Sequence, residues 1–270
     1  MEKLIITIAP TGNVPTKQMN INTPITIEEI VNDIILCQES GASIAHIHAR
    51  DLDENPTCDR EVYKDILKQL KTRKSNIITQ LSTGARGGEN TKEYRSQMLD
   101  LKTEMASLST GSSNFSSIVN ANSFELIEHL ANKMYKNNIK PEIEAFDLGM
   151  IDNAKLLLKK GILKGPLHFN MVMNVKGSLR GTPKNLMYMV ESIPKDATFN
   201  VSGIGNSQID MITMSILLGG HVRTGIEDVV YYEKNILATN KMLIDRVVRI
   251  AKELKRDIAN PDEAREILGL

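Results

Sequence analysis

The stretch GASIAHIHARD, residues 41–51, contains the pattern that decides the fold of this chain. Its glycine stops a helical segment, and the run from Ser43 to His48 is then typical of a short buried β-strand. Side chains alternate between the two faces of a strand, so His46 and His48 point to the same side. The pattern indicates a helix followed by a strand whose carboxyl end carries two imidazoles.

This pair of histidines has two interpretations. Neutral imidazole suits zinc, and a catalytic zinc usually has three protein ligands and one open position. Alternatively, the two polar side chains simply face solvent where a loop begins. A third ligand elsewhere in the chain, beside a cavity, would favour the metal site.

Outward from this stretch, a short apolar strand and an amphipathic helix alternate along the chain. The first helix has capping-box spacing from Thr26 to Glu29 and stops at Gly41. We expect strands over residues 4–9, 43–48, 76–81, 105–108, 141–146, 167–172, 198–201 and 221–223. The other helices are expected at 59–71, 92–99, 123–138, up to 161, at 185–192, up to 218, and at 234–255.

Eight strands alternating with eight helices over about 250 residues predict an α/β fold, a (β/α)₈ TIM barrel. We expect one domain over residues 1–270 with a short C-terminal helix near 260–268, because no linker rich in Pro, Gly or Ser interrupts the alternation. A doubly wound open sheet is the alternative, but such sheets usually have about five to seven strands.

Composition and charge narrow the class of protein. The 270 residues include 33 Lys and Arg and 33 Asp and Glu, so the formal net charge is zero. This balance argues against a nucleic acid or a membrane bound through bulk charge. We expect no signal peptide, since strand-like residues begin at Leu4, and the sequence has no long apolar stretch; Cys37 and Cys58 form no CxxC motif. We therefore expect a reduced, cytoplasmic protein.

A TIM barrel places its active site at the carboxyl ends of the strands. The unusual residues of this chain fall there: His46, His48, Ser82, Ser107, Glu144, Asn170, the run 202–205, Arg223, Glu227 and Asp228. A Gly-rich loop, residues 82–88, follows the third strand. The eighth strand lies beside the first in a closed barrel, and the first lies beside the second. Glu227 is therefore expected to reach the two histidines and complete a catalytic zinc pattern.

Several of these residues also fit ordinary structural roles. Glu227 and Asp228 could complement a helix dipole, and Glu144 could form a structural ion pair. The Gly203-Ile204-Gly205 run before a helix could bind phosphate or form a tight turn. His168 alternates with apolar residues and is expected to be a core histidine.

A long collinear set of motifs resembles the beta-keto acid cleavage enzyme family, and within it the branch that cleaves 3-keto-5-aminohexanoate. The resemblance covers nearly all of the chain and rests on residues 11–12, 24–29, 41–48, 80–84, 104–107, 114–115, 141–144, 183–189, 203–205, 219–228 and 264–268. It implies that a β-keto acid and acetyl-CoA give acetoacetate and a new acyl-CoA. It also implies a homo-oligomer, specifically a tetramer.

The resemblance also implies roles for individual residues. Three side chains would hold Zn²⁺: His46, His48 and Glu227. Asp228, oriented by Arg223 and Glu144, would be the base. The substrate carboxylate would meet the Ser82 hydroxyl and the backbone N–H groups of Thr83 and Gly84. Ser107 stands where the family usually has Thr and keeps a hydroxyl, and Gly203 and Gly205 would contact the CoA side.

One position departs from the pattern of the branch that cleaves 3-keto-5-aminohexanoate. That branch has a Glu two residues after the first-loop glycine, where it meets the substrate ammonium, whereas this chain reads Gly12-Asn13-Val14. A buried ammonium without a carboxylate is costly, so Asn13 and Val14 are expected to line a site for a substrate without the 5-amino group. The alternatives are another metal-dependent barrel lyase, aldolase or hydrolase, and a non-enzymatic small-molecule binding barrel.

Overall fold

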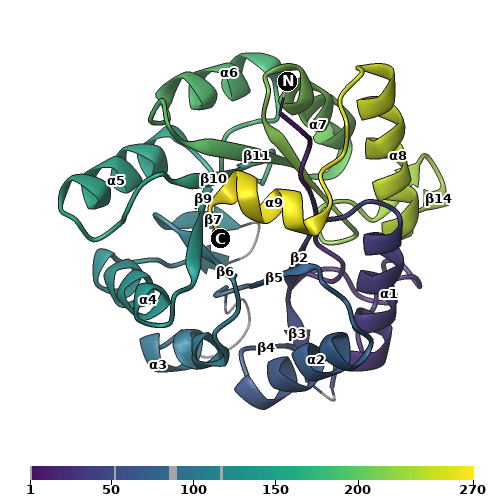
Figure 1. The fold of residues 1–270 in the computed structure, drawn as a ribbon, viewed down its shortest axis with the longest axis horizontal. Coiled ribbons are helices and arrows are strands. Elements are labelled where there is room, and N and C mark those ends of the chain that lie inside the picture. Colours follow the sequence, from purple (N-terminus) through teal and green to yellow (C-terminus); the bar gives the residue numbers. More distant parts are fainter. Residues whose placement is uncertain (1, 52, 85–89, 116–117) are drawn as a thin grey trace.

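Eight parallel strands close into a barrel surrounded by helices in the computed structural model, which describes residues 2–51, 53–84, 90–115 and 118–270 (Figure 1). The barrel strands are β1 (Ile6–Ile8), β2 (Ile44–Ile47), β5 (Ile78–Leu81), β6 (Met105–Ser109), β9 (Lys140–Ala145), β10 (His168–Met173), β11 (Thr198–Gly203) and β12 (His221–Thr224). β1 pairs with β2 on one side and with β12 on the other. The predicted (β/α)₈ barrel is confirmed.

The helices lie where the sequence periodicity predicts them, with local differences at their ends. They are α1 (Ile27–Glu39), α2 (Arg60–Thr72), α3 (Lys92–Ser96), α4 (Phe124–Lys136), α5 (Leu148–Lys159), α6 (Pro183–Ser192), α7 (Gln208–Leu217), α8 (Asn240–Glu253) and α9 (Pro261–Leu268). The helix expected at 92–99 is divided into α3 and a 3₁₀ helix, Gln97–Leu101. Thr26 and Glu29 form the expected capping box at the start of α1.

The prediction of a helix from residue 234 is wrong at its start. Residues on both sides of that point form a hairpin of β13 (Tyr231–Glu233) and β14 (Ile236–Leu237), and Asn235 supplies a turn with a φ of 64°. α8 begins after Thr239, whose hydroxyl accepts a hydrogen bond from the first turn. Apolar periodicity alone did not reveal this local turn.

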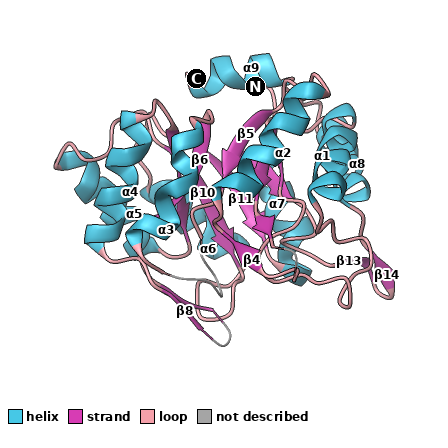
Figure 2. Ribbon diagram, turned by 90° about the horizontal axis from the view of Figure 1, so that it is seen from below, coloured by secondary structure: helices cyan, strands magenta, loops and turns pink. Residues whose placement is uncertain are grey.

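Three short hairpins stand at one end of the barrel and α9 covers the other (Figure 2). The further hairpins are β3 (Ala49–Arg50) with β4 (Pro56–Thr57) and β7 (Ser113–Phe115) with β8 (Ile118–Asn120). At the opposite end, α9 and Ala259, two residues before it, pack on side chains where the strands begin: Ile5, Ile44, Ile78 and Met105. This apolar floor closes the barrel and leaves its other end for the functional site.

Above the floor, the barrel interior is largely polar. Five buried side chains illustrate this: Gln80, Glu142, His168, Asn170 and Asn200. His168 Nδ1 lies 2.8 Å from the Thr198 hydroxyl, and His168 Nε2 lies 3.4 Å from Glu142 Oε2. His168 is thus a satisfied core histidine, as expected, rather than part of the group formed by His46, His48 and Glu227.

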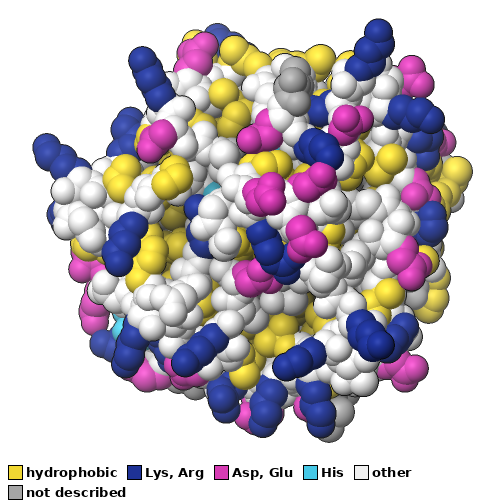
Figure 3. Space-filling model, in the orientation of Figure 1, with side chains coloured by type: hydrophobic (Ala, Val, Ile, Leu, Met, Phe, Trp, Pro, Cys, Tyr) yellow, Lys and Arg dark blue, Asp and Glu magenta, His cyan; other side chains and the backbone are white. Residues whose placement is uncertain are grey.

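On the face that carries α9, basic and acidic side chains are interspersed, in keeping with the zero net charge (Figure 3). Both cysteines are buried and free. Within the described ranges, no helix has the length and apolarity needed to traverse a bilayer.

Candidate active site and its relatives

Two histidines and a glutamate converge at the end of the barrel opposite α9. His46 lies in β2 and His48 follows it directly. Their Nε2 atoms are 3.2 Å apart, and Glu227 Oε1 lies 3.4 Å from the Nε2 of His48 and 3.9 Å from that of His46. Ligands of a tetrahedral zinc, each at about 2.0–2.1 Å, are separated by about 3.3 Å. The three side chains therefore have the chemistry and spacing that fit a zinc ion.

The fold explains how Glu227 reaches histidines so distant in sequence. β12 pairs with β1, and the backbone N–H of Glu227 donates to the carbonyl of Ala9 just after β1 (3.2 Å). The Glu227 side chain then packs directly on Gly12, which has a φ of 65°. A Cβ at Gly12 would lie 2.5 Å from Glu227 Cγ, so this approach requires glycine.

Replacing Gly12 with alanine is expected to displace Glu227 and lower zinc affinity. Because the new methyl group would overlap the Glu227 side chain, we expect a loss of about 10- to 100-fold, the usual effect of disturbing the support of a metal ligand. Chelator competition measures it. Gly161→Ala is the matched control, since Gly161 has a similar φ of 74° but nothing within 4 Å of the added Cβ. Equal zinc affinity in the Gly12 variant and the wild type would contradict the prediction.

The protonation states also suit a metal ion. Burial lowers the pKa of His46 to about 4, and the charge of Arg223 acts in the same direction. His46 is therefore neutral at physiological pH, the form that binds metal. Burial works to raise the pKa of Glu227, but Arg223 and the two histidines outweigh it and hold that pKa well below its usual range. Glu227 is thus ionised.

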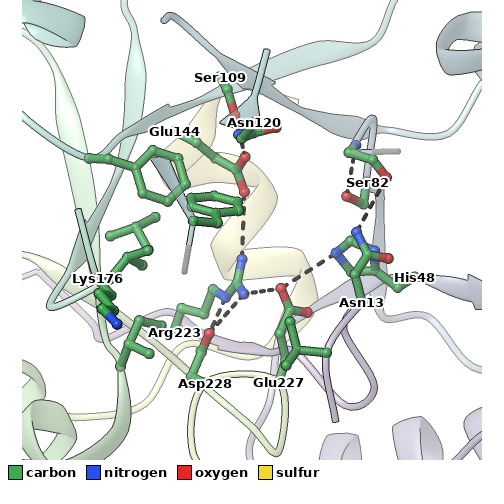
Figure 4. A pocket seen from close by; sticks show the side chains of 17 residues that line it. Asn13, His48, Ser82, Ser109, Asn120, Glu144, Lys176, Arg223, Glu227 and Asp228 are labelled. Carbon is green, nitrogen blue, oxygen red and sulfur yellow. Dashed lines mark hydrogen bonds and ion pairs between the residues drawn. The ribbon is translucent and has the colours of Figure 1, made fainter. Parts of the chain in front are cut away.

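Arg223 in β12 lies among three carboxylates beside His48 (Figure 4). Its Nη2 lies 2.9 Å from Asp228 Oδ1 and 2.5 Å from Glu227 Oε1, and its Nη1 lies 3.7 Å from Glu144 Oε1. Burial raises the pKa of Asp228 to about 6, although Arg223 opposes the shift, and burial also raises the pKa of Glu144. A carboxylate with a pKa near 6 is well matched to accept a proton at neutral pH.

These groups open into a cavity of about 270 Å³. One wall is polar and includes four of the residues singled out in the sequence: Asn13, His48, Ser82 and Gly84. Val14, which is 45% exposed, also lines the cavity. The carboxylates Glu144, Glu227 and Asp228 lie with Arg223 between this wall and an apolar one (Figure 4). Residues 85–88 of the expected Gly-rich loop lie outside the described residues.

Thr83 and Ser107, which the resemblance places at the substrate, bond to each other beside the cavity. The Thr83 N–H donates to the Ser107 hydroxyl (3.3 Å), and the Thr83 hydroxyl donates to the Ser107 carbonyl (2.8 Å). Neither residue lines the cavity. The Gly84 N–H donates to the Ser82 hydroxyl (3.2 Å), so this backbone is also engaged internally.

The two glycines after β11 likewise have structural surroundings. A Cβ at Gly203 would lie 2.7 Å from the backbone of Gln208 in α7, so Gly203 permits close helix packing. Gly205 donates its N–H to the carbonyl of Asp228 (2.8 Å) and so ties this loop to the carboxylate loop. Only Ile204, between them, lines the cavity.

The sequence pattern missed several lining residues. Ser109 lies two residues beyond Ser107 on β6, lines the cavity and donates to Glu144 Oε2 (2.9 Å). The apolar wall was also missed apart from Ile204 in the run 202–205; its other members are Phe115, Phe146, Val172 and Val175, with Lys176 at its edge. The alternation along β6 was the one available signal for Ser109.

The sequence profile of the beta-keto acid cleavage enzyme family matches residues 3–270. The chain belongs to that family. It is therefore an enzyme that acts on carbon–carbon bonds. A 3-keto-5-aminohexanoate cleavage enzyme from Acetoanaerobium sticklandii is 45% identical over 272 residues, which cover 100% of this chain and 99% of that one. A 3-oxoadipate:acetyl-CoA acetyltransferase from Cupriavidus necator is 39% identical, covering 98% and 94% of the two chains.

Solved structures with a similar fold include those of ObcA. The apo structure of ObcA has a TM-score of 0.82 and 20% sequence identity, over 92% of this beta-keto acid cleavage enzyme and 66% of the longer ObcA chain. A binary complex of ObcA with oxaloacetate has a TM-score of 0.83. At this identity the similarity concerns the fold alone.

Proposed function

We propose that this enzyme is zinc-dependent and converts a β-keto acid and acetyl-CoA into acetoacetate and a new acyl-CoA, on substrates without a 5-amino group. The observation that carries the proposal is the convergence of His46, His48 and Glu227 beside the Asp228–Arg223 pair, with His48, Glu227, Asp228 and Arg223 lining one cavity. The family membership and the acetyl-CoA named for the Cupriavidus necator relative support it.

In this proposal, His46, His48 and Glu227 hold the zinc ion. Zinc, when bound, supplies a Lewis acid that polarises the keto oxygen of the substrate and so acidifies the carbon between the two carbonyls. Asp228 is the base. Its raised pKa and its position beside Arg223 suit it to take a proton from that carbon and later return it.

The reaction balances in atoms and electrons. Asp228 removes the proton, and the substrate carbon forms a bond to the acetyl carbon of acetyl-CoA while the CoA thiolate leaves. The thiolate adds to the original keto carbon. The bond between that carbon and the carbon that attacked acetyl-CoA then breaks. The electron pair released takes the proton back from Asp228, giving acetoacetate and the new acyl-CoA.

In this proposal, the polar wall and the apolar wall of the cavity bind different parts of the substrate. Ser82 and Asn13 on the polar wall bind the substrate carboxylate, while Thr83 and Ser107 hold that loop through their mutual hydrogen bonds. Residues 203–205 contribute to the CoA side through Ile204.

The acyl tail lies toward the apolar wall and is uncharged. In this proposal each carboxylate that lines the described part of the cavity has a role other than binding an ammonium. Glu227 is a zinc ligand, Asp228 is the base beside Arg223, and Glu144 lies near Arg223 and accepts from Ser109. Val14 adds an apolar side chain to the lining.

Zinc-loaded enzyme assayed with acetyl-CoA and a panel of β-keto acids tests the proposed function. We expect release of acetoacetate with straight-chain acids such as 3-oxopentanoate and 3-oxohexanoate, and none when acetyl-CoA is omitted. Absence of acetoacetate with every acid would overturn the proposal, and cleavage without acetyl-CoA would indicate a different lyase.

Val14 is expected to select against an amino group in the substrate. The wild type should prefer 3-oxohexanoate to 3-keto-5-aminohexanoate by about two to four decades in kcat/KM, the scale of an unpaired buried charge. Val14→Glu should move the preference toward the amino substrate, and Val14→Gln, of similar size but uncharged, is the control. Measuring kcat/KM for both substrates in the three proteins is decisive. Equal use of both substrates by the wild type would show that Val14 does not select the tail.

A further inference from the structure

The ring of His46 has a second polar contact, on the side away from the proposed zinc. Its Nε2 faces His48 and Glu227, whereas its Nδ1 lies 2.6 Å from Oε1 of Gln80. Gln80 lies on β5 directly opposite His46 in the strand register, and its side chain is fully buried. The contact is therefore built into the barrel by two neighbouring strands.

The chemistry of imidazole determines the direction of this hydrogen bond. A ring that binds metal through Nε2 has its proton on Nδ1, so Nδ1 must donate and Gln80 must present its carbonyl oxygen. The opposite orientation of the amide would place the proton on Nε2 and block the metal. Gln80 Nε2, on the other side of the amide, has no hydrogen-bond partner among the described residues. The amide is thus oriented by His46.

We infer that Gln80 is a positioning residue for zinc binding: it fixes the tautomer and the ring orientation of His46 through the Nδ1–H bond. This inference rests on the zinc site of the proposed function. Histidine ligands of metals usually donate their other N–H to such a partner, and losing that partner typically lowers metal affinity by about 10- to 100-fold. Gln80 itself touches neither the metal nor the substrate.

Two substitutions at Gln80 separate the hydrogen bond from simple packing. Gln80→Met keeps the length of the side chain but removes the acceptor, and Gln80→Glu keeps an acceptor oxygen in place. Gln208→Met is the matched control, since Gln208 is also buried and makes one short side-chain hydrogen bond, to Thr224 (2.7 Å), away from the histidines.

The measurement is the zinc affinity of each metal-free protein, by competition with a chromogenic chelator, together with the visible spectrum of the Co²⁺ form. We expect Gln80→Met to bind zinc about 10- to 100-fold more weakly and to change the Co²⁺ spectrum. Gln80→Glu and Gln208→Met should stay within about threefold of the wild type, on the same scale.

Unchanged affinity in Gln80→Met would overturn the inference, and so would equal losses in Gln80→Met and Gln80→Glu, because the acceptor would then be irrelevant. Equal losses in the Gln208→Met control would overturn it too, since the effect would not depend on the contact with His46. Failure of the wild type to bind zinc at all would instead overturn the zinc site of the proposed function.

Discussion

Replacing both His46 and His48 with alanine is expected to remove stoichiometric zinc and nearly all activity while leaving the barrel folded. Glu227 alone cannot hold the ion, because a catalytic zinc needs about three protein ligands. Loss of Lewis-acid stabilisation of several kcal/mol corresponds to about four decades in kcat/KM. The imidazoles lie at the end of the barrel away from the apolar floor, so we expect the barrel to fold without them.

Elemental analysis of the purified variant measures the zinc, and circular dichroism measures the fold. His129→Ala is the control, since His129 lies on α4 and contacts Ser96 instead of the proposed ligands. One zinc per chain retained in the double variant would show that the metal is held elsewhere or not by these histidines.

Asp228→Asn is expected to keep zinc and lose turnover. The amide is nearly isosteric but cannot accept the proton, so kcat should fall by about two to four decades, the usual contribution of a general base. Because Glu227 and both histidines are untouched, zinc content measured in the same sample should equal that of the wild type.

The pH dependence gives an independent readout for Asp228. A base with its pKa raised to about 6 is active when deprotonated, so the activity should fall as the pH decreases through 6. This acidic limb should disappear in the residual activity of Asp228→Asn. Near-normal turnover of that variant would move the base role to Glu144, whose pKa is also raised by burial, and Glu144→Gln would then carry the large loss.

The fold was predictable because its main determinants are local. Alternating apolar strands and amphipathic helices follow from periodicity, and caps such as Thr26 with Glu29 mark helix starts. The proximity of Glu227 to the histidines was also predictable, since closure of the barrel brings the eighth strand beside the first.

The depth of a side chain within the barrel was not predictable from the sequence, and this explains why Ser107 was singled out and Ser109 was missed. The two-residue alternation of a strand shows which face a side chain occupies, but the stagger between strands decides its level. In the register of β6 and β9, Ser109 pairs with Glu144 at the level of the cavity, whereas Ser107 pairs with Glu142 one layer below. His46 and Gln80 share a level for the same reason.

Because β1 pairs with β12, the barrel can close only after its last strand has been synthesised. The N–H of Ile5 bonds to the ring of His221, 216 residues further along. During translation, His46 and His48 leave the ribosome roughly 10–40 s before Glu227, at ordinary elongation rates. Until then β1 keeps an open edge, and the cluster lacks its carboxylate. Nascent or prematurely terminated chains therefore carry two histidines without the complete reactive centre.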